Sequence, residues 1–137
     1  MYDPRLVQPM REELTALGVK ELTSADEVNK NLKDLPGTAL VVVNSVCGCA
    51  AGGARPGVAI AMEHNKKPDR FFTVFAGQDK EATDAARSYF LGYAPSSPSM
   101  ALLKNGQVAF MLERRDIEGF SPQEIAAKLT AAFEEHC

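Results

Sequence analysis

The chain has 137 residues, of which 45% are hydrophobic and 24% charged, and its formal net charge is −3. A chain of this length and composition can bury a sizeable hydrophobic core without disulfides, so we expect a single domain spanning residues 1–137. The slightly acidic balance offers no basic surface for nucleic acid or an anionic membrane, which argues against both as partners.

The first half of the chain predicts alternating helices and strands. Apolar residues at helical spacing predict an amphipathic helix over residues 4–17, with Gly18 as its C-terminal cap. A short strand at residues 19–22 and a helix from Ser24 to about residue 35 follow. Residues 38–44 are apolar on both faces and rich in β-branched side chains, which is typical of a strand in the middle of a sheet.

The second half continues the alternation and ends in a hairpin and a helix. We expect, in order, a weak helix over residues 50–63 that is irregular near its start, a buried strand at 71–77, a helix from Asp79 to Gly92, two strands within 100–112 and a helix over 121–135. Asn105-Gly106 is a strong hairpin signal, and Ser121 with Glu124 forms a capping box. The order predicts an α/β fold, in which helices cover both faces of a mixed sheet of parallel strands and one antiparallel hairpin.

Two of the three cysteines stand one residue apart in "VVVNSVCGCAAGGARPG", directly after the expected central strand. Functional groups of α/β proteins gather at the carboxyl ends of strands, where the N-terminus of the next helix favours an anion. There the helix dipole alone can lower the pKa of a thiol by up to about 1.5 units, so Cys47 is a candidate nucleophile and Cys49 its neighbour. Nothing in the N-terminal residues suggests export, and closely spaced cysteines in the cytoplasm indicate redox work or metal binding.

The one-residue spacing restricts a bridge between Cys47 and Cys49. Such a small ring strains the disulfide, and Gly48 supplies the backbone freedom to close it. We expect the reduction potential of any such bridge to be less negative than the value of about −270 mV for thioredoxin, which makes the bridge more oxidising. Two alternatives stay open at this point: cysteines that serve only as packing residues, and a metal or cluster site in which Cys137 joins the pair.

The element order resembles a thioredoxin fold with one extra N-terminal helix. In "SPSMALLKNGQV", Pro98 stands where thioredoxins carry the cis-proline that opens the hairpin strand beside the cysteines. More specifically, "VVVNSVCGCAAGGARPG", "FAGQDKEAT", "PSSPSMALLK" and "LTAAFEEHC" resemble the bacilliredoxin family, whose members have a Cys-Gly-Cys site, and the similarity covers almost the whole chain.

The resemblance implies a cytoplasmic enzyme that reduces mixed disulfides between protein cysteines and the small thiol bacillithiol, with weak disulfide isomerase activity. Its implied partners are S-thiolated client proteins and a low-molecular-weight thiol as co-substrate, with no metal and no bound cofactor. Carried over by position, Cys47 attacks and Cys49 can resolve the intermediate, while the cis bond of Pro98 brings the Ser97 backbone alongside Cys47.

The chain also departs from ordinary thioredoxins. Val46 replaces the tryptophan before the first cysteine, and Val41 replaces the buried acid that helps to deprotonate the second. Without that acid, Cys49 should attack its neighbour poorly, so exchange through Cys47 alone is favoured.

Two further residues are candidates for the site. Arg55 follows the cysteines and can hold a thiolate or a substrate carboxylate, or it is a solvated helix residue. Cys137 is a terminal thiol, an additional redox residue or a metal ligand. A scaffold that binds a partner without catalysis is the remaining functional class, in which Cys47 would have an ordinary pKa.

Overall fold

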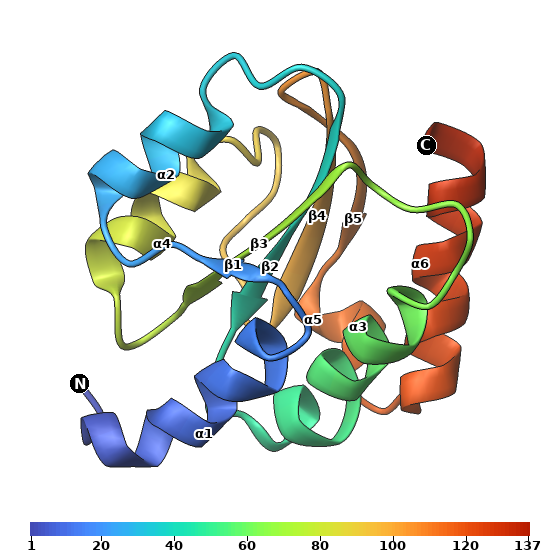
Figure 1. Ribbon diagram of the computed structural model, residues 1–137. Helices are drawn as coiled ribbons and strands as arrows, with labels where there is room; N and C mark the ends of the chain where they lie inside the picture. Colours follow the sequence, from blue (N-terminus) through green and yellow to red (C-terminus); the bar gives the residue numbers. More distant parts are fainter.

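The computed structural model describes residues 1–137 and is built on a five-stranded sheet in the order β1-β3-β2-β4-β5 (Figure 1). The strands are β1 (Lys20–Glu21), β2 (Thr38–Asn44), β3 (Arg70–Phe75), β4 (Ser99–Lys104) and β5 (Gln107–Leu112). The first three run parallel, whereas β4 is antiparallel to β2 and forms a hairpin with β5. The predicted mixed sheet with an antiparallel hairpin at one edge is therefore confirmed.

Helices cover both faces of this sheet, as expected. They are α1 (Pro4–Thr15), α2 (Ala25–Leu32), α3 (Arg55–Ala61) with the π-helical turn η1 (Ala50–Ala54) before it, α4 (Lys80–Arg87), α5 (Arg114–Ile117) and α6 (Pro122–His136). In Figure 1, α2 and α4 lie together on one side of the sheet, and α3 and α6 lie on the other. None of these helices has the length and apolar character needed to span a bilayer.

Strand β2 is the centre of the sheet, and every one of its seven residues is buried. Its alternate side chains enter two different cores, because successive residues of a strand point to opposite faces. Leu40 and Val42 face α3 and α6, whereas Val41 and Val43 face α2 and α4. Burial on both faces explains why the sequence of this strand is a continuous apolar run.

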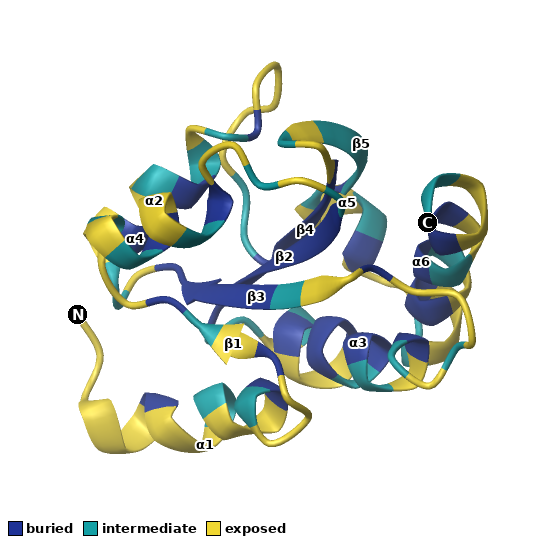
Figure 2. Ribbon diagram, turned by 45° about the horizontal axis from the view of Figure 1, so that its top comes forward, coloured by how far each residue is buried: buried dark blue, intermediate teal, exposed yellow.

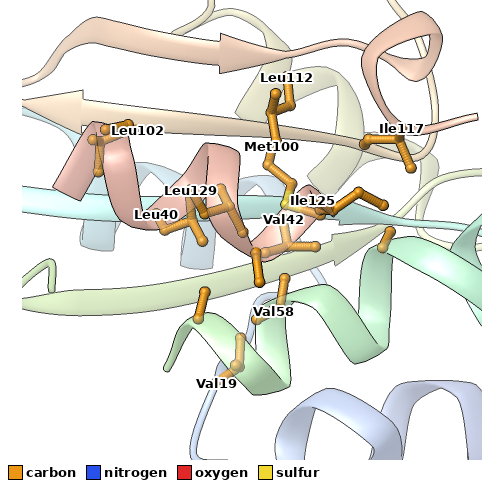
Figure 3. Packing of buried hydrophobic residues seen from close by; sticks show 14 of the residues in the cluster. Val19, Leu40, Val42, Val58, Met100, Leu102, Leu112, Ile117, Ile125 and Leu129 are labelled. Atoms are coloured by element: carbon orange, nitrogen blue, oxygen red, sulfur yellow. The ribbon is translucent and has the colours of Figure 1, made fainter. Parts of the chain in front are cut away.

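The core on the side of α3 and α6 is the larger of the two (Figure 3). Val58 of α3 and Ile125 and Leu129 of α6 pack there against Val42 and Met100 of the sheet. The two helices approach closely at Gly57, where an added Cβ would lie 2.8 Å from the Ile125 Cγ2 atom. As Figure 2 shows, buried residues line the inner faces of these helices and exposed residues their outer faces.

The extra N-terminal helix, α1, is fixed to the sheet by an arginine. The Arg11 guanidinium donates to Glu21 at 2.9 Å and to Asp79 at 2.7 Å, and it lies over the Phe75 ring. This places the C-terminal half of α1 beside the end of β2, where the cysteines follow.

Two elements, α4 and α5, differ most from the sequence-based predictions. Helix α4 ends at Arg87 instead of Gly92, and turns carry the chain onward to Gly92. The helix after the cysteines is irregular near its start, as predicted, because it begins with the π-helical turn η1 in a segment rich in glycine. Helix α5 was not predicted, because it is a single turn held by a capping box between Glu113 and Asp116.

Candidate functional site

A hydrogen-bonded loop connects the end of β2 to the first cysteine. The Asn44 side chain donates to the Met10 carbonyl of α1 at 3.2 Å, and its Oδ1 accepts from the Ser45 amide at 2.9 Å. The Ser45 hydroxyl then accepts from the Cys47 amide at 3.2 Å. Because Asn44 and Ser45 are buried, this chain of bonds fixes the backbone from which Cys47 projects.

Cys47 stands at the beginning of the helical segment, in the position of an N-cap. Its carbonyl accepts from the amides of Ala50 at 2.9 Å and Ala51 at 3.3 Å, so the helix starts after it. Its Sγ accepts from the Cys49 amide at 3.4 Å, as a capping side chain does. The thiol is half-buried, so the sulfur is oriented by the helix and still reachable from solvent.

The pKa values of the two thiols are shifted in opposite directions. The hydrogen bond from the Cys49 thiol, with further help from the Cys49 amide, the positive charge of Arg114 and the Ala50 amide, lowers the pKa of Cys47 against the effect of burial. Burial, followed by the hydrogen bond and the charge of Cys47, raises the pKa of Cys49. Such a pair ionises at Cys47 first, which divides the two sulfurs into a thiolate and a neutral thiol.

A second loop reaches the same end of the sheet and contains the cis peptide bond between Ser97 and Pro98, as predicted. Ser99 pairs with Val43 in the register of β2 and β4, so Pro98 lies opposite the end of β2. The Ser96 carbonyl holds this loop by accepting from the Ser99 hydroxyl at 3.0 Å and from Arg87 at 3.2 Å.

Arg55 lies beneath the site and does not reach its surface, in contrast to the expectation that it binds substrate. The residue is only 2% exposed, and its Nη1 donates to Asn44 Oδ1 and to the Ser45 carbonyl, both at 2.9 Å. Its Nε forms an ion pair with Glu13 of α1 at 3.1 Å, without hydrogen-bond geometry. The guanidinium is thus engaged by groups of the protein itself, and Arg55 orders the loop that carries Cys47.

The cationic side chain at the site is instead Arg114, which sequence reasoning did not find. It is the first residue of α5, its Nη1 donates to the Ser97 carbonyl at 3.4 Å, and its charge acts on both Cys47 and Cys49. No local pattern indicates this, because the link between Arg114 and the cysteines depends on how the hairpin folds back along β2.

Cys137 is not part of this site. Its thiol interacts with Thr38 at the first residue of β2, and burial raises its pKa. Cys47 follows the last residue of the same seven-residue strand, which is about 20 Å long. In Figure 1 the chain end marked C accordingly lies far from the arrowhead of β2. The three cysteines of one molecule therefore cannot bind the same metal ion or cluster. No three His, Cys, Asp or Glu side chains are grouped as metal ligands.

The remaining sequence candidates lie as follows. Gly48 is exposed between the cysteines, and a Cβ added to it would meet no atom within 4 Å. Val41 is fully buried between Phe72 and Ala101 in the sheet, so the position where thioredoxins carry a buried acid holds an apolar side chain.

Residues 2–137 match the family described as "Disulphide isomerase". The chain is 53% identical over 137 residues to a bacilliredoxin of Koribacter versatilis, covering 100% of this chain and 94% of that relative. It is 56% identical over 132 residues to a bacilliredoxin of Halalkalibacterium halodurans, covering 96% and 90% of the two chains. The chain belongs to the bacilliredoxin family.

Solved structures similar to this bacilliredoxin-family chain include several thioredoxins. Fasciola hepatica thioredoxin has a TM-score of 0.60 and 17% identity, covering 87% of this chain and 100% of its own. Mitochondrial thioredoxin 3 of Saccharomyces cerevisiae has a TM-score of 0.56 and 15% identity, covering 90% and 98%. These neighbours confirm the thioredoxin fold, and together with the bacilliredoxin relatives they identify the protein as a thiol-disulfide oxidoreductase.

Proposed function

We propose that this oxidoreductase reduces mixed disulfides between protein cysteines and bacillithiol in the cytoplasm, with Cys47 as the nucleophile. The observation that carries the proposal is the capping position of Cys47, where its half-buried sulfur accepts the Cys49 amide. A thiolate held there is stabilised in the reduced protein, and it remains exposed enough to attack a sulfur of a small disulfide. The strong sequence similarity to proteins named bacilliredoxins supports this choice of reaction.

In the proposed reaction, the Cys47 thiolate attacks the bacillithiol sulfur of the mixed disulfide. A new bond forms between the Cys47 Sγ and that sulfur, the old S–S bond breaks, and the client leaves as a thiolate that takes up a proton from solvent. Cys47 is thereby oxidised to the disulfide level and the client cysteine is reduced. A second bacillithiol thiolate, or Cys49, then releases the adduct from Cys47.

The neighbouring residues are proposed to orient the partners. The Ser97 backbone beside Pro98 offers polar groups to the substrate, and Gly48 leaves room above the sulfurs. The raised pKa of Cys49 makes it a slower resolving group, which favours release by a second small thiol. The role of Arg55 is to position the loop and not to bind substrate.

The decisive experiment uses a model client protein carrying one bacillithiol mixed disulfide. With the Cys49→Ser variant we expect stoichiometric release of the client thiol and an adduct of one bacillithiol on Cys47, located by mass spectrometry. The Cys47→Ser variant is the matched control and should release nothing. Equal adduct formation in the Cys47→Ser protein would rule out the proposal.

A weak isomerase activity is a second candidate, favoured by the description of the matching family. Isomerisation requires the same Cys47 thiolate to attack a client disulfide, and Cys49 would release trapped complexes. We expect reactivation of a scrambled disulfide protein to depend on Cys47, and a Cys47→Ser variant that still reactivates it would contradict this candidate.

A further inference from the structure

Arg114 is tied to the loop that ends in the cis peptide bond. Its backbone amide donates to the Ser96 hydroxyl at 3.3 Å, and its Nη1 donates to the Ser97 carbonyl at 3.4 Å. Both bonds connect α5 to the loop before Pro98 across 17 and 18 residues of sequence. They hold the guanidinium at the end of the sheet where the two thiols lie, because the loop before Pro98 stands opposite the end of β2, and its charge acts on both thiols.

The guanidinium keeps donors free toward solvent. Its side chain is 49% exposed, and its ion pair with Glu118 at 2.9 Å involves only Nε. Glu118 is 60% exposed, so water weakens that pair strongly, and the Nη2 group makes no hydrogen bond within the protein. An arginine in this state can bind a carboxylate through its planar fork of N–H groups.

The same side chain makes the loop less suited to an extended peptide. A polypeptide substrate that paired with the backbone beside Pro98 would use the Ser97 carbonyl as an acceptor, and the Arg114 Nη1 group, which donates to this oxygen at 3.4 Å, occupies one of its two lone pairs and competes with that pairing. A small thiol needs no such pairing. The arrangement therefore favours a compact, negatively charged partner over a strand of protein.

We propose that Arg114 is the specificity-determining residue for the small-thiol partner, and that its guanidinium binds the carboxylate of an anionic low-molecular-weight thiol while the sulfur of that thiol reacts with Cys47. The inference rests on the proposed exchange reaction at Cys47, and it assigns to Arg114 the substrate contact that the sequence suggested for Arg55. In the reaction, the Cys47 thiolate forms a bond to one sulfur of a small disulfide, and the other half leaves as a thiolate.

The test compares three symmetrical disulfides that differ in charge. They are dithiodipropionate, with one carboxylate per sulfur, neutral bis(2-hydroxyethyl) disulfide and cationic cystamine. The rate constant for modification of Cys47 is measured at low ionic strength in a Cys137→Ser background, with peptide mass spectrometry to locate the adduct. Dividing each value by the rate with the neutral disulfide removes changes in the thiolate fraction.

We expect the anionic disulfide to react faster than the neutral one, and the Arg114→Gln variant to lose about fivefold of this preference. Arg115→Gln is the matched control, because it removes the same charge from a neighbouring side chain that is 82% exposed and pairs with Glu113 instead. Its preference should stay within about twofold of the parent. Arg114→Lys should keep part of the preference, since the charge remains without the fork.

Three outcomes would overturn the inference. The first is an unchanged preference in Arg114→Gln, and the second is an equal loss in Arg115→Gln, which would indicate the overall charge of the protein as the cause. Both leave exchange at Cys47 intact. The third is a Cys47 that reacts with none of the three disulfides, and this result alone would also remove the proposed function.

Discussion

Replacing Arg55 by Met tests whether the buried guanidinium holds the active-site loop. The substitution removes the two hydrogen bonds at 2.9 Å to Asn44 and Ser45. Asn44 Oδ1 keeps its bond from the Ser45 amide, but the Ser45 carbonyl loses a charged donor, and a hydrogen bond of this kind contributes about 1.5–3 kcal/mol. The ion pair with Glu13, whose side chain is 47% exposed, adds less than about 1 kcal/mol.

We therefore expect Arg55→Met to lower the free energy of unfolding by about 2–4 kcal/mol. The measurement is urea denaturation of the reduced protein followed by circular dichroism, with the denaturant slope compared between variants. Glu13→Gln is the control, because it removes only the half-exposed partner, and it should cost less than about 1 kcal/mol. If Arg55→Met costs no more than Glu13→Gln, the guanidinium does not hold the loop.

Two further predictions concern packing and pH. Gly57→Ala should destabilise the protein by about 1–3 kcal/mol in the same urea assay, because its Cβ would clash with Ile125. Gly52→Ala is the control, since its Cβ meets open space in the same helical segment, and it should be neutral or stabilising. Equal effects of the two substitutions would contradict the close approach of α3 and α6. The native pKa of Cys47 is lowered, so the unfolded state binds more protons. The stability that Cys47 contributes relative to Cys47→Ser should therefore be present at and above the unfolded pKa of about 8.5 and be lost as the pH falls through the lowered native pKa. Unfolding curves in reducing buffer measure this difference, and a value that stays constant or falls as the pH rises toward about 8.5 would contradict the lowered pKa.

Strong local signals predicted the elements that frame the site. The strand Thr38–Asn44 was expected with the bounds that it has, because its apolar residues are buried on both faces of the sheet. The hairpin and the capping box of α6 were also predicted, since Asn105 and Gly106 adopt the positive φ values of a tight turn and Ser121 accepts from the Glu124 amide. In each case the information lies within a few neighbouring residues.

The electrostatics of the site could not be read from the sequence in the same way. Arg55 is buried because its partners come from α1 and the end of β2, and nothing in its own segment distinguishes it from a solvated helix residue. Arg114 reaches the cysteines only after the hairpin has returned along the sheet. Cys137 belongs to the opposite end of β2, a separation that depends on where α6 packs.

The central claim is that Cys47 is the sulfur that ionises first, and the rate of iodoacetamide alkylation against pH tests it most directly. The reduced Cys137→Ser protein keeps the Cys47 and Cys49 pair intact, and peptide mass spectrometry follows each site separately. We expect the alkylation midpoint of Cys47 to lie below the value of about 8.5 for a free cysteine and that of Cys49 to lie above it. A midpoint for Cys47 at or above about 8.5, or a Cys49 that reacts at lower pH than Cys47, would contradict the account.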